Sequence, residues 1–119
     1  MVQTNSQKMA QAAYASVRQR ASPGGLPEKY ASFARSCPSL VHTCGLAQAV
    51  AFAKAKDHGQ YLDDLAAVLN KIGHAEAASV DSLEKATREH PVLTYVRLSR
   101  NALQAAGWLK RYVEAVAPE

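Results

Sequence analysis

The sequence predicts an all-α fold, a single-domain helical bundle of about six helices that ends in a long C-terminal helix. Alanine is abundant, β-branched residues form no alternating strand pattern, and glycine and proline stand mostly where helices can begin or end. The chain has 119 residues, of which 48% are hydrophobic and 20% are charged. This composition favours a packed core, and the length predicts one domain over residues 1–119.

The first predicted helix covers residues 4–20. Thr4 and Gln7 have the spacing of a capping box, in which side chains satisfy the free N–H groups at the start of a helix. Apolar residues recur at i, i+4 and i+8, which predicts a buried stripe of Met9, Ala13 and Val17. The segment of residues 21–27 contains Pro-Gly-Gly, which predicts a flexible turn.

Two helices are predicted on either side of Pro38. The first covers residues 28–36 and ends there because a proline disfavours helical geometry at the residue before it. The second covers residues 38–56, since proline fits the first turn of a helix. Its apolar residues occupy every face, which predicts a central position. Gly45 in its middle costs roughly 1 kcal/mol relative to alanine, and close packing of another helix would make that cost tolerable.

Glycine, acidic residues and proline mark the ends of the remaining helices. Gly59 and Gly73 each follow a stretch with a lysine in its last turns, so we expect left-handed C-caps on either side of a helix over residues 60–72. Asp81 and Glu84 predict the N-terminal cap of a short helix that reaches residue 89. Pro91 then opens the last and longest helix, residues 92–116.

The last helix carries the clearest pattern in the sequence. About one third of its circumference is apolar and predicts the core face, which consists of Tyr95, Leu98, Ala102, Ala105, Leu109, Val113 and Val116.

Three arginines lie with Gln104 on a different face of this helix. Arg97, Arg100 and Arg111 fall within about 60° of one another and form a line about 20 Å long, which can follow a phosphate backbone. A solvated, solubilising face has the same pattern. Trp108 lies beside the arginines, where it can stack on a base or anchor the core or an interface.

The charge is distributed unevenly along the chain. Residues 1–56 contain seven basic side chains and one acid, whereas residues 57–119 contain seven basic and nine acidic side chains. A protein with one-sided positive charge can meet an anionic partner such as nucleic acid. No stretch is apolar and long enough for a membrane span or a signal peptide, so we expect a cytoplasmic protein without a membrane partner.

The residues that could carry chemistry predict no catalytic or metal site. Cys37, His42 and Cys44 are close in sequence, but His42 and Cys44 point about 200° apart on a helix and cannot share one ion. We interpret both cysteines as reduced core residues. Asp63 and Asp64 diverge on a helix and are expected on a solvated face. The boundary histidines are expected to face water; they are His58, His74 and His90.

Phosphate-loop, dinucleotide-binding and zinc-protease signatures are absent from the sequence. We therefore expect a protein that is not an enzyme and that needs no cofactor and no small-molecule substrate.

Two segments carry a resemblance to a known family. In residues 30–52 an aromatic-rich short helix leads into Pro38 and then into Gly45-Leu46-Ala47-Gln48. In residues 98–112 the element Trp108-Leu109-Lys110-Arg111 closes the final helix. In this order, and at this chain length, the segments resemble the small helical subunit of the type III-B CRISPR effector, the Cmr complex. Cys44 departs from the polar residue expected before Gly45.

The resemblance implies a non-catalytic structural subunit, copies of which stack in the minor filament and line the groove that holds target RNA along the crRNA. The implied partners are the backbone subunit, other Cmr subunits, further copies of the chain, crRNA and target RNA. Charge placement, rather than a family motif, selects the candidate RNA-binding residues, which are Lys8, Arg18, Lys54, Lys56, Arg97, Arg100 and Arg111. Trp108 and Lys110 are candidate subunit-interface residues.

Two other interpretations of the sequence stay open. One is a helical protein-interaction module whose Arg/Trp face docks a protein rather than RNA, since both residue types are favoured interface anchors. The other is a small hydrolase or metalloprotein, which would carry stoichiometric metal on purification.

Overall fold

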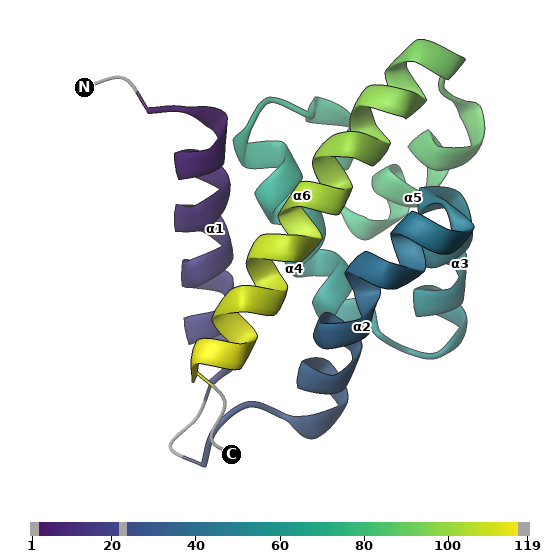
Figure 1. Cartoon of the computed structure of the whole chain (residues 1–119). Helices are drawn as coiled ribbons and strands as arrows, with labels where there is room; N and C mark the ends of the chain where they lie inside the picture. The colour runs from purple at the N-terminus through teal and green to yellow at the C-terminus, as the bar shows by residue number, and fades with distance from the viewer. Residues whose placement is uncertain (1–2, 22–23, 117–119) are drawn as a thin grey trace.

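The computed structural model describes residues 3–21 and 24–116 and confirms the predicted all-α class (Figure 1). Part of the predicted Pro-Gly-Gly turn, residues 22 and 23, lies outside the described residues. The described elements are α1 (Asn5–Arg20), α2 (Glu28–Cys44), α3 (Leu46–Ala55), α4 (Gly59–Lys71), the short 3₁₀ helix η1 (Ala75–Ala77), α5 (Val80–Glu89) and α6 (Val92–Val116).

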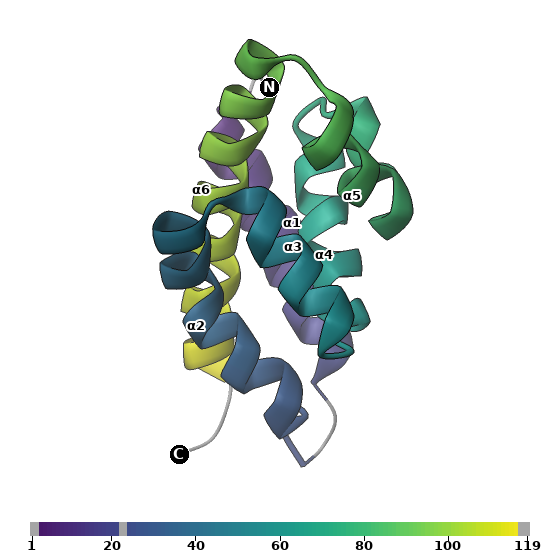
Figure 2. The same cartoon turned by 90° about the vertical axis from the view of Figure 1, so that its right-hand side faces the viewer.

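The long helix α6 organises the packing. It crosses the molecule and contacts α1, α2 and α4, while α3, α5 and η1 form a second group around α4 (Figures 1 and 2). The predicted stripe of α1 is buried, and the predicted core face of α6 is buried except at its half-buried ends, Tyr95 and Val116. The core residues that these two helices supply are Met9, Ala13, Val17, Leu98, Ala102, Ala105, Leu109 and Val113.

The predicted break at Pro38 is wrong, because α2 continues through this proline and ends at Cys44. Pro38 lacks only the one N–H that would bond to a carbonyl four residues earlier, and the rest of the helix tolerates that loss. The break lies at Gly45, whose φ of 89° and ψ of 160° cannot continue a right-handed helix. Its N–H donates to the carbonyl of Val41 at 2.9 Å, and its carbonyl accepts from the N–H of Ala49 at 3.0 Å.

A side chain from α6 supports this break between α2 and α3. The first N–H groups of a helix have no partner within it. The N–H of Ala47, in the first turn of α3, donates to the hydroxyl oxygen of Tyr95 at 3.1 Å. Gly45 therefore ends one helix and starts the next, and Tyr95 satisfies a donor that the new helix leaves free.

Substituting Gly45 by alanine should lower the free energy of unfolding by about 1–3 kcal/mol, because few residues other than glycine adopt this backbone conformation. An added Cβ would lie 3.7 Å from the Tyr95 hydroxyl, an ordinary contact, so the cost is one of backbone strain. Gly107→Ala is the matched control, since Gly107 lies inside α6 with no neighbour within 4 Å of an added Cβ. Urea unfolding should show Gly107→Ala unchanged or more stable by up to about 1 kcal/mol. Equal effects at the two glycines would contradict the strain argument.

The glycine caps are half correct. Gly73 has the predicted positive φ, 105°, but Gly59 is the first residue of α4. Asp57 takes the left-handed position instead, with a φ of 62°, and the N–H of His58 donates to the carbonyl of Ala53 at 2.8 Å. This six-to-one bond is the Schellman closure of a helix, and aspartate is one of the residues that tolerates it without being glycine.

The predicted cap of α5 is also wrong. Ser79 is the N-cap, and it forms a capping box with Ser82 rather than the expected pair of Asp81 and Glu84. Ser79 accepts from the N–H of Ser82 at 3.1 Å, and Ser82 accepts from the N–H of Ser79 at 3.0 Å. Glu84 instead pairs with Arg88 one turn later, at 2.7 Å. The capping box predicted for α1, between Thr4 and Gln7, is confirmed.

A buried ion pair ties three helices together, and the sequence did not predict it. Asp64 of α4, expected on a solvated face, is only 5% exposed. Arg20 of α1 donates to both of its carboxylate oxygens, at 3.0 and 3.1 Å. The hydroxyl of Tyr30 in α2 donates to the same carboxylate. Burial, and then the hydrogen bond to Asp64, raises the pKa of Tyr30, so this hydroxyl stays a donor.

Candidate nucleic-acid interface

The predicted basic face of α6 is present on the surface. Arg97, Arg100 and Arg111 are exposed, together with Gln104. Within the part of the chain that the structure describes, no acidic side chain lies within 4.0 Å of any of the three arginines. A guanidinium group is always charged and offers a planar fork of donors that fits two phosphate oxygens. The face therefore presents three unpaired phosphate-binding groups over about 21 Å of helix.

Shallow grooves between α6 and the start of α1 flank two of these arginines. Arg97 borders a groove of about 230 Å³ together with Asn5. Arg111 borders a groove of about 270 Å³ together with Ser6 and Trp108. Because α1 begins beside both grooves, its polar side chains add neutral donors and acceptors to the arginine line. This contribution from α1 follows from the tertiary packing and could not be read from the helical period of α6.

His74 forms part of the floor beside Arg97, although it was expected to face water. It is 5% exposed. One ring nitrogen, Nδ1, lies 2.9 Å from a carboxylate oxygen of Glu76, and the other, Nε2, lies 2.8 Å from the amide nitrogen of Asn101 in α6. The ring therefore joins the loop after α4 to α6 and fixes the position of the groove.

An aromatic cluster lies where α1 and α6 meet. The ring of Trp108 stacks on Tyr112 with centroids 5.9 Å apart, and Tyr112 makes an edge contact with Tyr14 at 5.4 Å. Arg18 lies 6.0 Å above the ring of Tyr14. Tyr14 is 49% exposed, whereas Trp108 is half-buried. The cluster connects candidate residue Arg18 to the groove of Arg111 and offers an aromatic surface next to positive charge.

The other candidate residues are not brought to this face. Lys54 of α3 pairs with Asp81 of α5 at 3.3 Å, and Lys56 follows at the end of α3. Helix α3 packs against α2, α4 and α5, and Figure 2 shows it in front while α1 lies behind. Lys8 is half-buried on α1. Lys110, the predicted interface partner of Trp108, is half-buried about 200° away around α6, so these two residues lie on opposite flanks.

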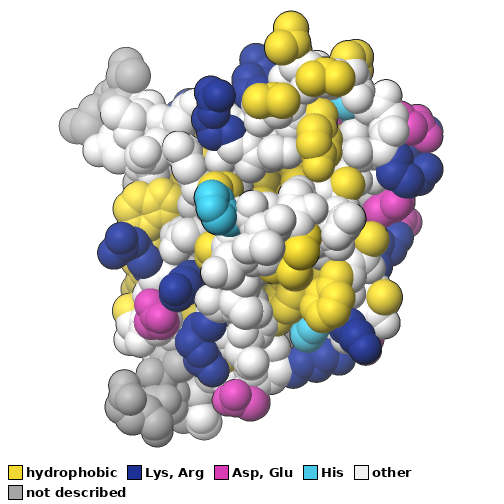
Figure 3. Space-filling model, turned by 45° about the vertical axis from the view of Figure 1, so that its right-hand side comes forward, with side chains coloured by type: hydrophobic (Ala, Val, Ile, Leu, Met, Phe, Trp, Pro, Cys, Tyr) yellow, Lys and Arg dark blue, Asp and Glu magenta, His cyan; other side chains and the backbone are white. Residues whose placement is uncertain are grey.

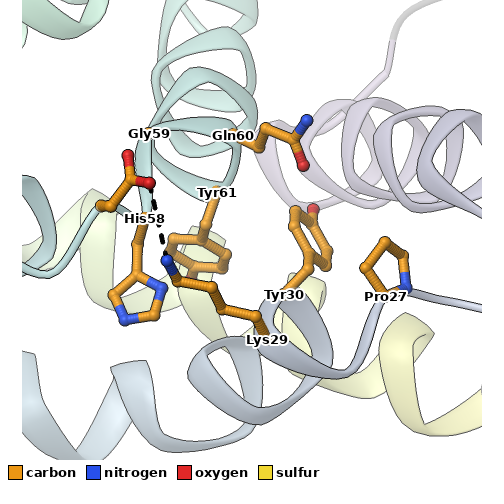
Figure 4. A pocket seen from close by; sticks show the side chains of 8 residues that line it. Pro27, Lys29, Tyr30, His58, Gly59, Gln60 and Tyr61 are labelled. Carbon is orange, nitrogen blue, oxygen red and sulfur yellow. Dashed lines mark ion pairs between the residues drawn. The ribbon is translucent and has the colours of Figure 1, made fainter.

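A pocket of about 470 Å³ lies between the start of α2 and the start of α4 (Figure 4). Each polar group around it has a neighbour. The ammonium of Lys29 lies 3.7 Å from the carboxylate of Asp57. The ring of His58 stacks on Phe33 with centroids 4.1 Å apart, and burial, followed by the charge of Lys29, lowers its pKa. With the Tyr30 hydroxyl on Asp64, these side chains serve to join α2 and α4.

The two cysteines lie in different environments. Cys37 is buried as expected, but Cys44, the last residue of α2, is exposed, and both are free thiols. Over residues 3–21 and 24–116, no three His, Cys, Asp or Glu side chains are grouped so that they could hold a metal ion. Across the same residues, no helix is long and apolar enough to cross a membrane.

Stability should fall at alkaline pH because of Cys37. Burial raises the pKa of its thiol from the ordinary 9.0 to about 11. A folded-state pKa above the unfolded one means that the stabilisation is complete below pH 9 and is lost as the pH rises toward 11. Between pH 8 and pH 10 the free energy of unfolding should fall by about 1.3 kcal/mol from this group. Urea unfolding across this range should show a slope that Cys37→Ala removes and Cys44→Ala keeps; a slope that survives Cys37→Ala would assign it to another group.

The fold and this surface define a class of protein: a small all-α chain whose longest helix presents an unpaired basic face. Comparison with known proteins gives the family. The family described as "CRISPR-associated protein (Cas_Cmr5)" matches residues 5–116. The chain therefore belongs to the Cmr5 family of CRISPR-associated proteins, and the resemblance to the type III-B small helical subunit is confirmed.

Two relatives from Thermus thermophilus support this assignment over the whole length. The protein called "CRISPR system Cmr subunit Cmr5" is 39% identical over 121 residues, which cover 99% of this chain and 100% of the relative. The crystal structure of a "CRISPR-associated Cmr5 family protein" is similar with a TM-score of 0.83 at 36% identity. That similarity covers 98% of this chain and 100% of the crystallised one.

Proposed function

We propose that the chain is a non-catalytic structural subunit of a type III-B CRISPR effector in antiviral defence. In this proposal its copies stack in the minor filament, and the basic face of α6 helps to hold target RNA along the crRNA. The observation that carries the proposal is the exposed line of Arg97, Arg100 and Arg111 without an acidic partner in the described residues. The family membership supplies the effector.

The proposed mechanism is contact with the phosphate backbone, which carries no sequence information. Pairing with crRNA would select the target, and the arginines would hold whatever strand is paired. Three contacts per copy bind weakly alone. Copies joined in a filament act together, because each later contact is made within one assembly at high effective concentration. The exposed ring of Tyr14 adds a surface on which an unpaired base can stack.

The aromatic cluster also favours a second candidate function, docking of a protein on the Arg/Trp face. Tyrosine, tryptophan and arginine are the residue types enriched among interface anchors. Salt separates the two candidates. Contacts to phosphates weaken steeply as the salt concentration rises, whereas an interface anchored by buried aromatic rings keeps its affinity.

Co-purification of the tagged protein from its native host tests the proposal, with washes at moderate and at high salt. We expect mass spectrometry to identify other Cmr subunits and RNA sequencing to identify crRNA. Release of RNA at high salt, with protein partners retained, supports the phosphate contacts. Recovery of unrelated proteins without RNA would overturn the proposal and assign the Arg/Trp face to protein docking.

A further inference from the structure

The beginning of α6 exposes an apolar surface that the arginine face does not use. Five large hydrophobic side chains are exposed in the described part of the chain, and three of them lie within five residues of each other. Val92 is 75% exposed, Leu93 84% and Val96 45%. Figure 3 shows hydrophobic side chains gathered at the top of the molecule, where α6 begins. A cluster of this kind marks an interaction site more often than scattered single residues do.

This surface continues into a groove between α2 and α6. Val92, Val96, Ser99 and Leu103 fall within about 60° of one another on the helix and form a stripe about 16 Å long. The second half of the stripe, Ser99 and Leu103, lines a groove of about 390 Å³. Val41 and Leu46 form part of the opposite wall. The stripe and the groove thus make one elongated apolar site, wide enough to take side chains of a docked segment.

The polar groups at the groove indicate the chemistry of what it binds. His42 and Arg100 border it, and none of its lining residues is acidic. Arg100 has no acidic partner within 4.0 Å among the described residues. The hydroxyl of Ser99 is buried without a hydrogen-bond partner, so a docked backbone or side chain can satisfy it. An occupant that complements these groups has apolar side chains next to carboxylates.

We propose that this site docks a segment of a different protein, one with apolar side chains at helical spacing flanked by aspartate or glutamate. RNA is a poor occupant, because valine and leucine side chains offer nothing to phosphates. A second copy of the chain is also a poor occupant. Two-fold pairing of the stripe would place the Arg97 and Arg100 of both copies side by side, and like charges repel. The proposal does not depend on RNA holding, since the stripe consists of other residues.

Site-specific photocrosslinking in the native host tests this proposal with the full chain. Benzoylphenylalanine introduced at Val96 should crosslink, on irradiation, to a protein segment that has apolar residues at helical spacing and an acid within one turn. Mass spectrometry of the adduct identifies the segment. The same probe at Ala67, exposed on α4, should not capture it. A crosslink to RNA, to a second copy or to a segment without acids overturns the proposal, and so does the absence of an adduct.

A charge variant makes the test sharper. Arg100→Glu should lower the yield of the Val96 adduct at least fivefold, whereas Lys71→Glu, the same charge change on α4, should leave the yield unchanged. An equal yield in both variants overturns the proposed role of charge and the proposal with it. The probe at Leu93 replaces that at Val96 if circular dichroism shows that the Val96 variant does not fold. Loss of RNA from the co-purified complex leaves this result unaffected, so the two proposals fail separately.

Discussion

Replacing Arg97, Arg100 and Arg111 together by glutamate should lower retention of single-stranded RNA by the assembled complex at least tenfold at low salt. Each contact to a single-strand phosphate contributes about −0.7 to the slope of log affinity against log salt concentration, so three contacts contribute about −2 per copy. That slope corresponds to a roughly 20-fold loss between 50 and 200 mM salt. The variant should therefore bind more weakly and also respond less to salt. RNA titrations at several salt concentrations measure both effects.

A matched control separates the α6 face from the net charge of the protein. Lys29, Lys71 and Lys85 are exposed on other helices, and their replacement by glutamate changes the charge by the same amount. This control should keep the affinity and the salt slope within about twofold of the unmodified complex. Equal losses in the two variants would mean that overall charge holds the RNA. Unchanged binding by the arginine variant, with an intact circular-dichroism spectrum, would count decisively against this face.

Much of this surface could be predicted from the sequence, because it lies on one helix. The helical period alone places Arg97, Arg100 and Arg111 on one side, and the structure has them exposed there. The period could not show which other helices lie beside them. The predicted set therefore included Lys54 and Lys56, which the fold leaves on α3. It also could not show the grooves formed with α1, since packing between distant segments creates them.

The helix boundaries were predicted less well where two local rules compete. Pro38 and Gly45 both disfavour a continuous helix, and the sequence analysis chose the proline. The structure breaks at the glycine. The difference comes from Tyr95, which is 48 residues away from the N–H of Ala47 that it accepts from, and so stabilises the start of α3 at that point. A contact of this range leaves no pattern in a local window of sequence.

Asp64 shows the same limit in the core. An aspartate next to Asp63 on a helix is typical of a solvated face, and Asp63 is indeed exposed. The available signal was the position of Asp64 three residues after Tyr61 and four before Val68, which share the buried side of α4. That spacing indicates burial. It does not identify Arg20 and Tyr30 as partners, because they come from two other helices.

Asp64→Ala should destabilise the protein by about 3–5 kcal/mol, because it leaves a partly buried guanidinium and a buried hydroxyl without an acceptor. Arg20 and Asp64 are 25% and 7% exposed at their side chains, so water replaces the lost contacts only in part. A loss of this size is a large share of the roughly 5–15 kcal/mol that holds a domain folded. It corresponds to a fall in Tm of roughly 15 °C. Thermal and urea unfolding followed by circular dichroism measure it.

Two further variants test whether the ion pair, rather than the removed volume, sets this loss. Asp64→Asn keeps the shape and one acceptor oxygen but no charge, so it should cost less than Asp64→Ala and more than the exposed Asp63→Ala, which should stay within about 0.5 kcal/mol. Tyr30→Phe removes one donor and should cost about 1–2 kcal/mol in the unmodified protein. In the Asp64→Ala background the same change should cost much less, since the hydroxyl has already lost its acceptor. Additive losses for Asp64 and Tyr30 would show that the two residues stabilise α1, α2 and α4 independently.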